Sequence, residues 1–112
     1  IDVSLVGSEM CIRDSQLDAY ISNDVWLKNA KHANLMGKKL SDGLNKYPEI
    51  KLAYPTHANE IFVKIPEKII KQLNSEGYTI NDDEWDGKAV RLVTAWNTDP
   101  NDIDNFLNII KP

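Results

Sequence analysis

The stretch KAVRLVTAW, residues 88–96, decides the fold of this 112-residue chain. Apolar and polar residues alternate along it, and a period of two predicts a β-strand whose successive side chains point to opposite faces. One face carries a set suited to a core, namely Val90, Leu92 and Thr94. The other carries Ala89, Arg91 and Val93. Such a strand needs helices over its first face, and the rest of the chain must supply them.

Three segments outside this strand have helical patterns. A stripe at helical spacing predicts a helix from Ser22 or Asn23, either of which can cap it, to about Lys46. The stripe consists of Trp26, Ala30, Ala33, Leu40 and Leu44, widened by Leu27, Leu35 and Met36. PEKIIKQLNSEGY (66–78) predicts a short helix closed by Gly77. TDPNDIDNFLNIIK (98–111) predicts a last helix, capped by Asp99 with Pro100 in its first turn.

Three further segments have the pattern of strands. IKLAYP (50–55) and NEIFVKIP (59–66) each end at a proline, which cannot continue a ladder of hydrogen bonds, and YTIN (78–81) is a third candidate. The order of elements is then α-β-β-α-β-β-α. Closely spaced strands between helices predict an α+β domain, an antiparallel sheet with helices on one face.

Arg91 is the strongest candidate for a functional residue. It lies in the middle of a strand that has the pattern of a central strand, on the face that the helices of this chain are not expected to cover. A guanidinium on a rigid strand offers a fork of donors that matches a carboxylate or phosphate, which lysine cannot copy. A surface arginine paired with one of the many acidic residues explains the same pattern, and spacing alone leaves both interpretations open.

Composition excludes several classes of function. The net charge is −4, without a run of basic residues, so nucleic acid is not an expected partner. The apolar runs are far shorter than the roughly 20 residues of a membrane helix, so no membrane partner is expected. Cys11 is the single cysteine and cannot form a disulfide within the chain, which favours a cytoplasmic location.

The other polar residues form no recognisable site. His32 and His57 lie in a helix and a turn, beside charged or polar neighbours, so hydrogen-bonding or solvent-exposed roles are expected. The helical lysines follow the pattern of a solvated face. NDDEWD (81–86) lacks the spacing of a calcium loop, so a turn and no metal site is expected. The tryptophans are expected in the core or an interface.

The first 15 residues stand apart, because residues 3–15 have the pattern of neither a strand nor a helix that could belong to the rest of the chain. They have neither the apolar core nor the positive start of a signal peptide. LVGSEMCIRDS (5–15) can be encoded by the transposase adapter used in preparing sequencing libraries, apart from its last base. We therefore interpret residues 1–15 as a non-native, adapter-derived segment, and expect the natural domain to comprise residues 16–112.

Three blocks of the sequence resemble a known family. VWLKNAKHANLMGKKLSDGL (25–44), PTHANEIFVKIP (55–66) and GKAVRLVTAWNTDPNDIDNFL (87–107) occur in the order of the C-terminal part of low-specificity L-threonine aldolases. These are pyridoxal-phosphate enzymes of the aromatic amino acid β-eliminating lyase group. The resemblance covers residues 16–112 and implies the small C-terminal domain of the aspartate-aminotransferase fold, known as fold type I.

The resemblance implies an activity for the parent protein. It is the cleavage of L-threonine, L-allo-threonine and related β-hydroxy-α-amino acids to glycine and an aldehyde, with pyridoxal 5′-phosphate as cofactor. In this family an arginine on a small-domain strand binds the substrate carboxylate, and the motif VRLVTAW assigns that role to Arg91. His57 and Asn59 border this region without a role that the family defines.

The same resemblance implies what residues 16–112 lack. The cofactor's lysine and phosphate-binding residues belong to the large domain of the family, so the chain alone is expected neither to bind cofactor nor to catalyse. Its expected partners are that large domain, further copies of the enzyme and a small amino acid. The alternative interpretation is a free-standing α+β module that binds a small ligand or a protein without catalysis.

Overall fold

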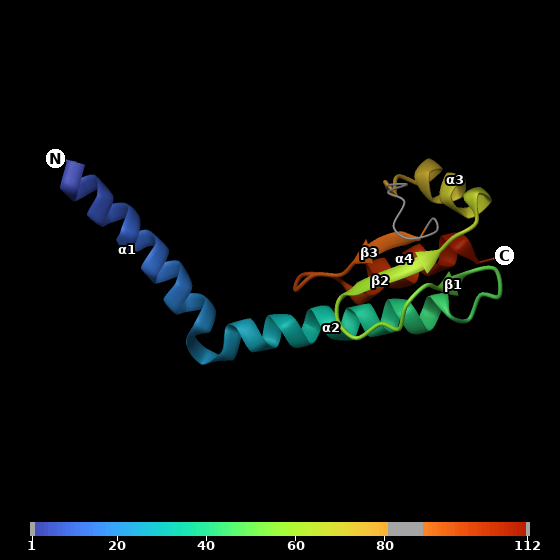
Figure 1. Ribbon diagram of the computed structural model, residues 1–112, viewed down its shortest axis with the longest axis horizontal. Helices are drawn as coiled ribbons and strands as arrows, with labels where there is room; N and C mark the ends of the chain where they lie inside the picture. The colour runs from blue at the N-terminus through green and yellow to red at the C-terminus, as the bar shows by residue number, and fades with distance from the viewer. Residues whose placement is uncertain (1, 81–88, 112) are drawn as a thin grey trace.

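The computed structural model describes residues 2–80 and 89–111. The described helices are α1 (Asp2–Ile21), the single turn η1 (Ser22–Asp24), α2 (Val25–Leu44), α3 (Glu67–Ser75) and α4 (Pro100–Ile110). The described strands are β1 (Lys51–Leu52), β2 (Glu60–Lys64) and β3 (Val90–Val93). The molecule measures 61 × 28 × 26 Å because α1 extends away from the remaining elements, as Figure 1 shows.

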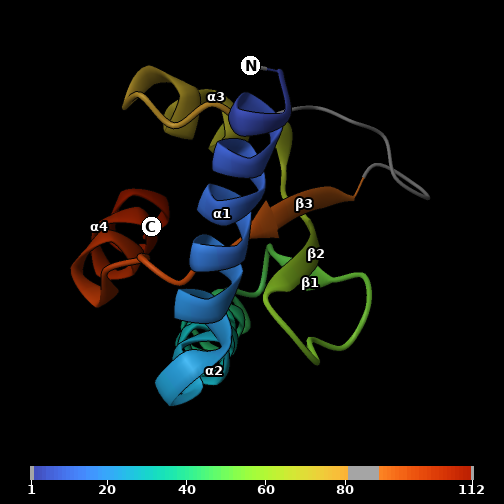
Figure 2. The same ribbon diagram turned by 90° about the vertical axis from the view of Figure 1, so that its left-hand side faces the viewer.

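The three strands form one antiparallel sheet in the order β1-β2-β3. Ile61 lies opposite Leu92 and Phe62 opposite Arg91, so residues of even and odd number on β2 occupy different faces. Figure 2 shows α3 and α4 on one side of the strands, and side chains of α2, α3 and α4 form one core with Ile61 and Val63 of β2. The predicted α+β class, with helices on one face of an antiparallel sheet, is confirmed.

The core lies between this sheet face and the helices. Ile61 and Val63 of β2 are completely buried, as are Leu44 of α2 and Leu73 of α3. The helix α4 adds three side chains at helical spacing, Ile103, Phe106 and Ile110. Their burial provides the main favourable free energy for ordering the strands, because apolar area removed from water stabilises by about 25 cal/mol per Å².

Two predicted helix ends are confirmed in detail. The Asp99 side chain caps α4 by accepting a hydrogen bond from the Asn101 amide at 2.9 Å, and Pro100 occupies the first turn. Gly77 follows α3 with a φ of +95°, a value that only glycine adopts readily. Both ends were recognisable because capping depends on a few adjacent residues.

The start of α2 and part of its stripe differ from the prediction. Asn23 and Asp24 both have left-handed backbone conformations, with φ values of 56° and 59°, and α2 begins at Val25 without a side-chain cap. Trp26 and Leu35 are 44% and 59% exposed. The stripe was drawn too wide: Trp26 lies in the first turn of α2, before its buried part begins, and Leu35 lies on a different face of the helix from Ala33 and Leu40.

One predicted strand is absent from the described residues. Residues 78–80 of YTIN form no ladder, and Asn81 lies outside the described residues. Tyr78 instead packs edge-to-face on Phe106, with ring centroids 5.3 Å apart. The strand predicted over 88–96 is shorter than expected, since β3 covers Val90–Val93 with a bridge at Ala89, and Lys88 lies outside the described residues.

The helix α1 runs without a break through residue 15. The segment was expected to lack regular structure related to the rest of the chain, yet it is helical from Asp2 to Ile21. Residues 10–21 of α1 bury no side chain, and Met10, Ile12 and Leu17 are 58–59% exposed. The division of the chain at residue 15 therefore stays a prediction. No helix in the described part of the chain is long and apolar enough to span a membrane.

Candidate functional site

Arg91 lies on β3, on the sheet face turned away from the helices. Its neighbours along the strand, Val90 and Leu92, face the core, and Arg91 lies directly opposite Phe62 of β2. Its side chain is 46% exposed. Among the described strands β3 is at the edge of the sheet and β2 at its centre, which corrects the expectation that Arg91 belongs to a central strand. The predicted placement of Arg91 on the uncovered face is confirmed.

Glu60 is the acidic neighbour of Arg91 on this face. Its Oε1 lies 3.8 Å from Nη1 of Arg91, and its side chain is also 46% exposed. The contact runs diagonally across the ladder, since Glu60 is paired with Val93. At 3.8 Å and this exposure, the pair is an electrostatic contact of about 0–1 kcal/mol, longer than a hydrogen bond. The interpretation of Arg91 as a partner for an acidic residue is thus realised in this chain.

Apolar and aromatic side chains surround this charged pair. The rings of Tyr54 and Phe62 meet edge-to-face, with centroids 5.8 Å apart and planes at 87°. Val93 is 55% exposed and Trp96, just beyond β3, is 63% exposed. Isolated apolar residues are ordinary on a surface, but several of them on one sheet face around a guanidinium form a surface suited to a partner. We call Tyr54, Glu60, Phe62, Arg91 and Val93 the open sheet face.

The end of β3 is tied to the neighbouring elements by hydrogen bonds. Thr94 donates its hydroxyl to the carbonyl of Ala33 in α2 at 2.7 Å, and Asn59 donates its side-chain amide to the Thr94 carbonyl at 2.8 Å. Thr94 is 3% exposed. These bonds fix the strand three residues beyond Arg91, and they define where the guanidinium projects.

The close approach of α2 to Asn59 and Thr94, at the end of β3, depends on Gly37. A Cβ atom at this position would lie 2.8 Å from the Ala58 carbonyl oxygen and 3.3 Å from Oγ1 of Thr94. A glycine within a helix costs about 1 kcal/mol relative to alanine, so its presence is explained by this backbone contact. The sequence pattern did not predict that Asn59, Thr94 and Gly37 come together. The sign of this cluster in the sequence was a threonine, Thr94, on the apolar face of the strand.

The two histidines are separate from Arg91. His32 on α2 bonds through Nε2 to the carbonyl oxygen of Thr98 at 2.7 Å, so it joins α2 to the segment before α4. This hydrogen-bonding role matches the expectation for His32. His57 is exposed in the loop between β1 and β2.

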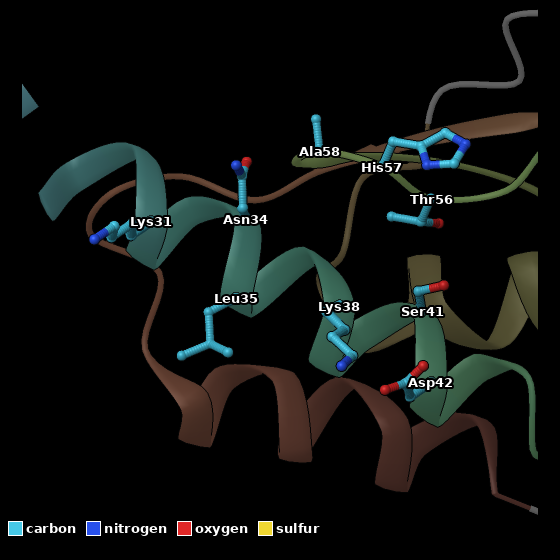
Figure 3. A pocket seen from close by; sticks show the side chains of 9 residues that line it. All are labelled: Lys31, Asn34, Leu35, Lys38, Ser41, Asp42, Thr56, His57 and Ala58. Carbon is cyan, nitrogen blue, oxygen red and sulfur yellow. The ribbon is translucent and has the colours of Figure 1, made fainter. Parts of the chain in front are cut away.

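His57 borders a groove between that loop and α2. The groove has a volume of about 580 Å³ and is lined by residues of α2, including Lys31 and Lys38, and by residues 56–58. Figure 3 shows the ammonium groups of both lysines directed away from the loop. The hydroxyl of Thr56 is buried and has no hydrogen-bond partner among the described residues. The groove does not include Arg91, and its charged lining residues, Lys31, Lys38 and Asp42, all belong to α2.

The described residues do not provide the reactive lysine that the expected cofactor needs. Pyridoxal phosphate is held through an imine to a lysine, which has to be shielded from water to react readily. Every described lysine is exposed except the half-buried Lys39, whose ammonium is bound to Asp104 at 3.2 Å and to the Pro100 carbonyl at 3.2 Å. The described residues also bring together no group of three side chains able to hold a metal ion. The site consists of Arg91 and its surroundings.

Comparison with known proteins gives a consistent result. No family model matches the chain. It is 30% identical over 79 residues to the low-specificity L-threonine aldolase of Pseudomonas aeruginosa, a match covering 70% of this chain and 22% of that protein. It is 28% identical over 94 residues to the enzyme of the same name from a Pseudomonas species, covering 84% of this chain and 27% of the relative. The resemblance stated from the three sequence blocks is confirmed.

Solved structures agree on the fold. The threonine aldolase of Leishmania major superposes with a TM-score of 0.73 at 24% identity, over 85% of this chain and 28% of that one. The cystine C-S lyase C-DES superposes with a TM-score of 0.68 at 15% identity, over 84% and 26%. The predicted fold, that of fold type I enzymes, is confirmed. The chain spans about a quarter of the length of the proteins that it matches.

Proposed function

We propose that this chain is the small domain of a pyridoxal-phosphate-dependent L-threonine aldolase, with residues 16–112 as its natural part. The sequence similarity to two such aldolases and the shared fold support this proposal. Since the chain matches 22–27% of those aldolases, the remainder of the enzyme would supply the lysine and the phosphate-binding groups. The alternative of a free-standing binding module has no comparable support.

The proposed reaction cleaves the bond between Cα and Cβ of L-threonine, L-allo-threonine and related β-hydroxy-α-amino acids, releasing glycine and an aldehyde. The cofactor, when bound to the whole enzyme, supplies the electron sink for this cleavage. The contribution of this chain is to bind and orient the substrate. Arg91 would hold the substrate carboxylate through two parallel hydrogen bonds, and so fix the direction of the bond to be broken.

The position of Arg91 is the observation that carries this role. The guanidinium stands on a strand whose end is fixed by the Thr94 and Asn59 hydrogen bonds, and it projects from the open sheet face. A side chain on a rigid strand positions a ligand more accurately than one on a loop. The family motif VRLVTAW independently points to the same residue.

The open sheet face also suggests how the chain is used in the whole enzyme. Its exposed apolar residues, among them Val93 and Tyr54, are suited to being covered by the remainder of the enzyme or by a second copy. Covering would exclude water from Arg91 and strengthen its interaction with a carboxylate. We also propose that the whole enzyme assembles into a homo-oligomer and is cytoplasmic, and that this chain by itself has no activity.

The test is a complete enzyme in which residues 16–112 replace the matching part of the Pseudomonas aeruginosa relative. In it, Arg91→Ala should lower kcat/KM for L-threonine by about 30- to 4000-fold, equivalent to about 2–5 kcal/mol, because the carboxylate loses a desolvated charge pair. Arg91→Lys should recover only part of this loss, since lysine lacks the planar fork.

Lys64→Ala is the matched control. Lys64 is an exposed cation of the same sheet, at the other end of β2, and its removal should change kcat/KM by less than about twofold. Near-normal kinetics of Arg91→Ala would exclude the carboxylate role. An inactive enzyme with the unmodified chain, despite correct folding and bound cofactor, would contradict the aldolase proposal itself.

A further inference from the structure

Glu60 lies beside Arg91 on the face where the substrate is proposed to bind. The two residues carry opposite charges on this face, and their nearest charged atoms, Oε1 and Nη1, are 3.8 Å apart. The cations of the neighbouring strands, Lys51 and Lys64, are paired with each other at the other end of the ladder. Glu60 therefore places a negative charge within 4 Å of the Arg91 guanidinium on this face.

The geometry of this contact distinguishes two roles for Glu60. A carboxylate that orients an arginine is expected to form a short bidentate hydrogen bond of about 2.7–2.9 Å. The Glu60 contact is a single contact at 3.8 Å between two half-exposed side chains, so it holds the guanidinium weakly. Its charge nevertheless acts at longer range, because Coulomb energy falls only with the inverse of distance.

We propose that Glu60 sets the substrate affinity of the site by opposing the binding of the substrate carboxylate to Arg91. This inference rests on the proposed function of Arg91. A carboxylate bound to the same guanidinium lies on the order of 5–8 Å from that of Glu60, where two like charges repel appreciably in a partly covered site. Glu60 thereby keeps the KM for amino acids high and favours release of the glycine product, which carries the same carboxylate.

The first experiment removes the charge of Glu60 and keeps its shape. In the complete enzyme assembled from this chain and the Pseudomonas aeruginosa relative, Glu60→Gln should lower the KM for L-threonine about three- to tenfold, with kcat within about twofold. The ratio of the two KM values should move towards one as NaCl is raised to about 1 M, because salt screens part of the repulsion in a partly covered site. A purely structural role would show no such salt dependence.

Glu67→Gln is the matched control for the charge change. Glu67 lies on α3, is paired with Lys71 at 3.5 Å and has an 82% exposed side chain. Its replacement changes the net charge equally and should leave KM unchanged. In an Arg91→Ala background, Glu60→Gln should have no effect on KM, because the interaction that it opposes is gone.

A second measurement uses the 112-residue chain by itself and does not depend on activity. The ¹⁵Nε and ¹Hε resonances of Arg91 should shift in Glu60→Gln and stay in place in Glu67→Gln. A rise or no change in KM for Glu60→Gln overturns the inference, as does an unshifted Arg91 resonance. The two proposals fail in different ways. If the proposed function is wrong, Arg91→Ala leaves kcat/KM intact, while the Arg91 resonance still reports the contact with Glu60.

Discussion

The hydroxyl of Thr94 donates a hydrogen bond of 2.7 Å to the backbone carbonyl of Ala33, across 61 residues of sequence. It joins the end of β3 to the middle of α2, and both residues are buried, at 3% and 8% exposure. The Ala33 oxygen accepts this bond in addition to its place within the helix. The contact therefore fixes the strand that carries Arg91 against the longest helix of the core.

Thr94→Val should destabilise the chain by about 1–3 kcal/mol. Valine has nearly the same shape, so the change removes the hydroxyl's hydrogen bonds to the Ala33 and Asn59 carbonyls and places a methyl group against these buried polar atoms. Urea unfolding followed by circular dichroism measures the effect. Thr79→Val, at an exposed position, is the control and should change the free energy of unfolding by less than about 0.5 kcal/mol. Equal stabilities of the two variants would contradict a structural role of this bond.

Gly37→Ala should cost about 1–3 kcal/mol, although alanine favours helices. The added Cβ would lie 2.8 Å from the Ala58 carbonyl oxygen and 3.2 Å from the Asn59 Cα, and both are backbone atoms that cannot move alone. Gly43→Ala is the comparison, since its Cβ meets the terminal methyl groups of Leu107, which can rotate away. The unfolding free energies should rank Gly37→Ala as the more destabilising, and the reverse order would refute the explanation.

The alternation of buried and exposed residues around Arg91 was one feature of the fold and site that could be predicted from the sequence. A period of two depends only on which residues face the core, so Val90 and Leu92 identified the buried face and Arg91 the open one. The cap of α4 by Asp99 was equally predictable, because its partner is two residues away. Local chemistry specifies such features without knowledge of the tertiary structure.

Features that depend on distant residues were not predictable. The exposure of Trp26 follows from where along α2 the packing begins, which the periodicity of α2 does not contain. Tyr78 was assigned to a strand because aromatic residues favour strands, yet its contact with Phe106 holds it at the helix layer. The contact of Glu60 with Arg91 needed the register of β2 and β3, which the sequence did not specify.

Leu35 and Leu40 lie on different faces of α2 and provide a direct test of the actual width of the stripe. Leu40→Ala should destabilise the chain by about 2–5 kcal/mol, since Leu40 is 7% exposed and its loss creates a cavity in the core. Leu35→Ala, at 59% exposure, should change the free energy of unfolding by less than about 0.5 kcal/mol. Thermal and urea unfolding both report the difference. Comparable losses in the two variants would contradict the observed orientation of the helix.

Asp99→Ala should lower stability by about 0.5–2 kcal/mol. The Asp99 carboxylate accepts the Asn101 amide at 2.9 Å at the start of α4, where the helix dipole also favours a negative charge. Asp42→Ala, an exposed acidic residue near the C-terminal end of α2, is the control and should be neutral or slightly stabilising. Equal effects of the two changes would show that the Asp99 cap adds nothing measurable.

Val93→Lys should affect the isolated chain little and the complete enzyme strongly. Val93 is 55% exposed on the open sheet face, so lysine extends into solvent and the isolated chain should lose less than about 1 kcal/mol in urea unfolding. If the remainder of the enzyme covers this face, the same lysine becomes a buried, unpaired charge costing several kcal/mol. In the enzyme assembled with the Pseudomonas aeruginosa relative, we therefore expect a lower melting temperature and at least tenfold lower activity. Glu76→Lys, in the exposed turn after α3, is the control and should leave both properties unchanged. A fully active Val93→Lys enzyme would show that the open sheet face stays in contact with water.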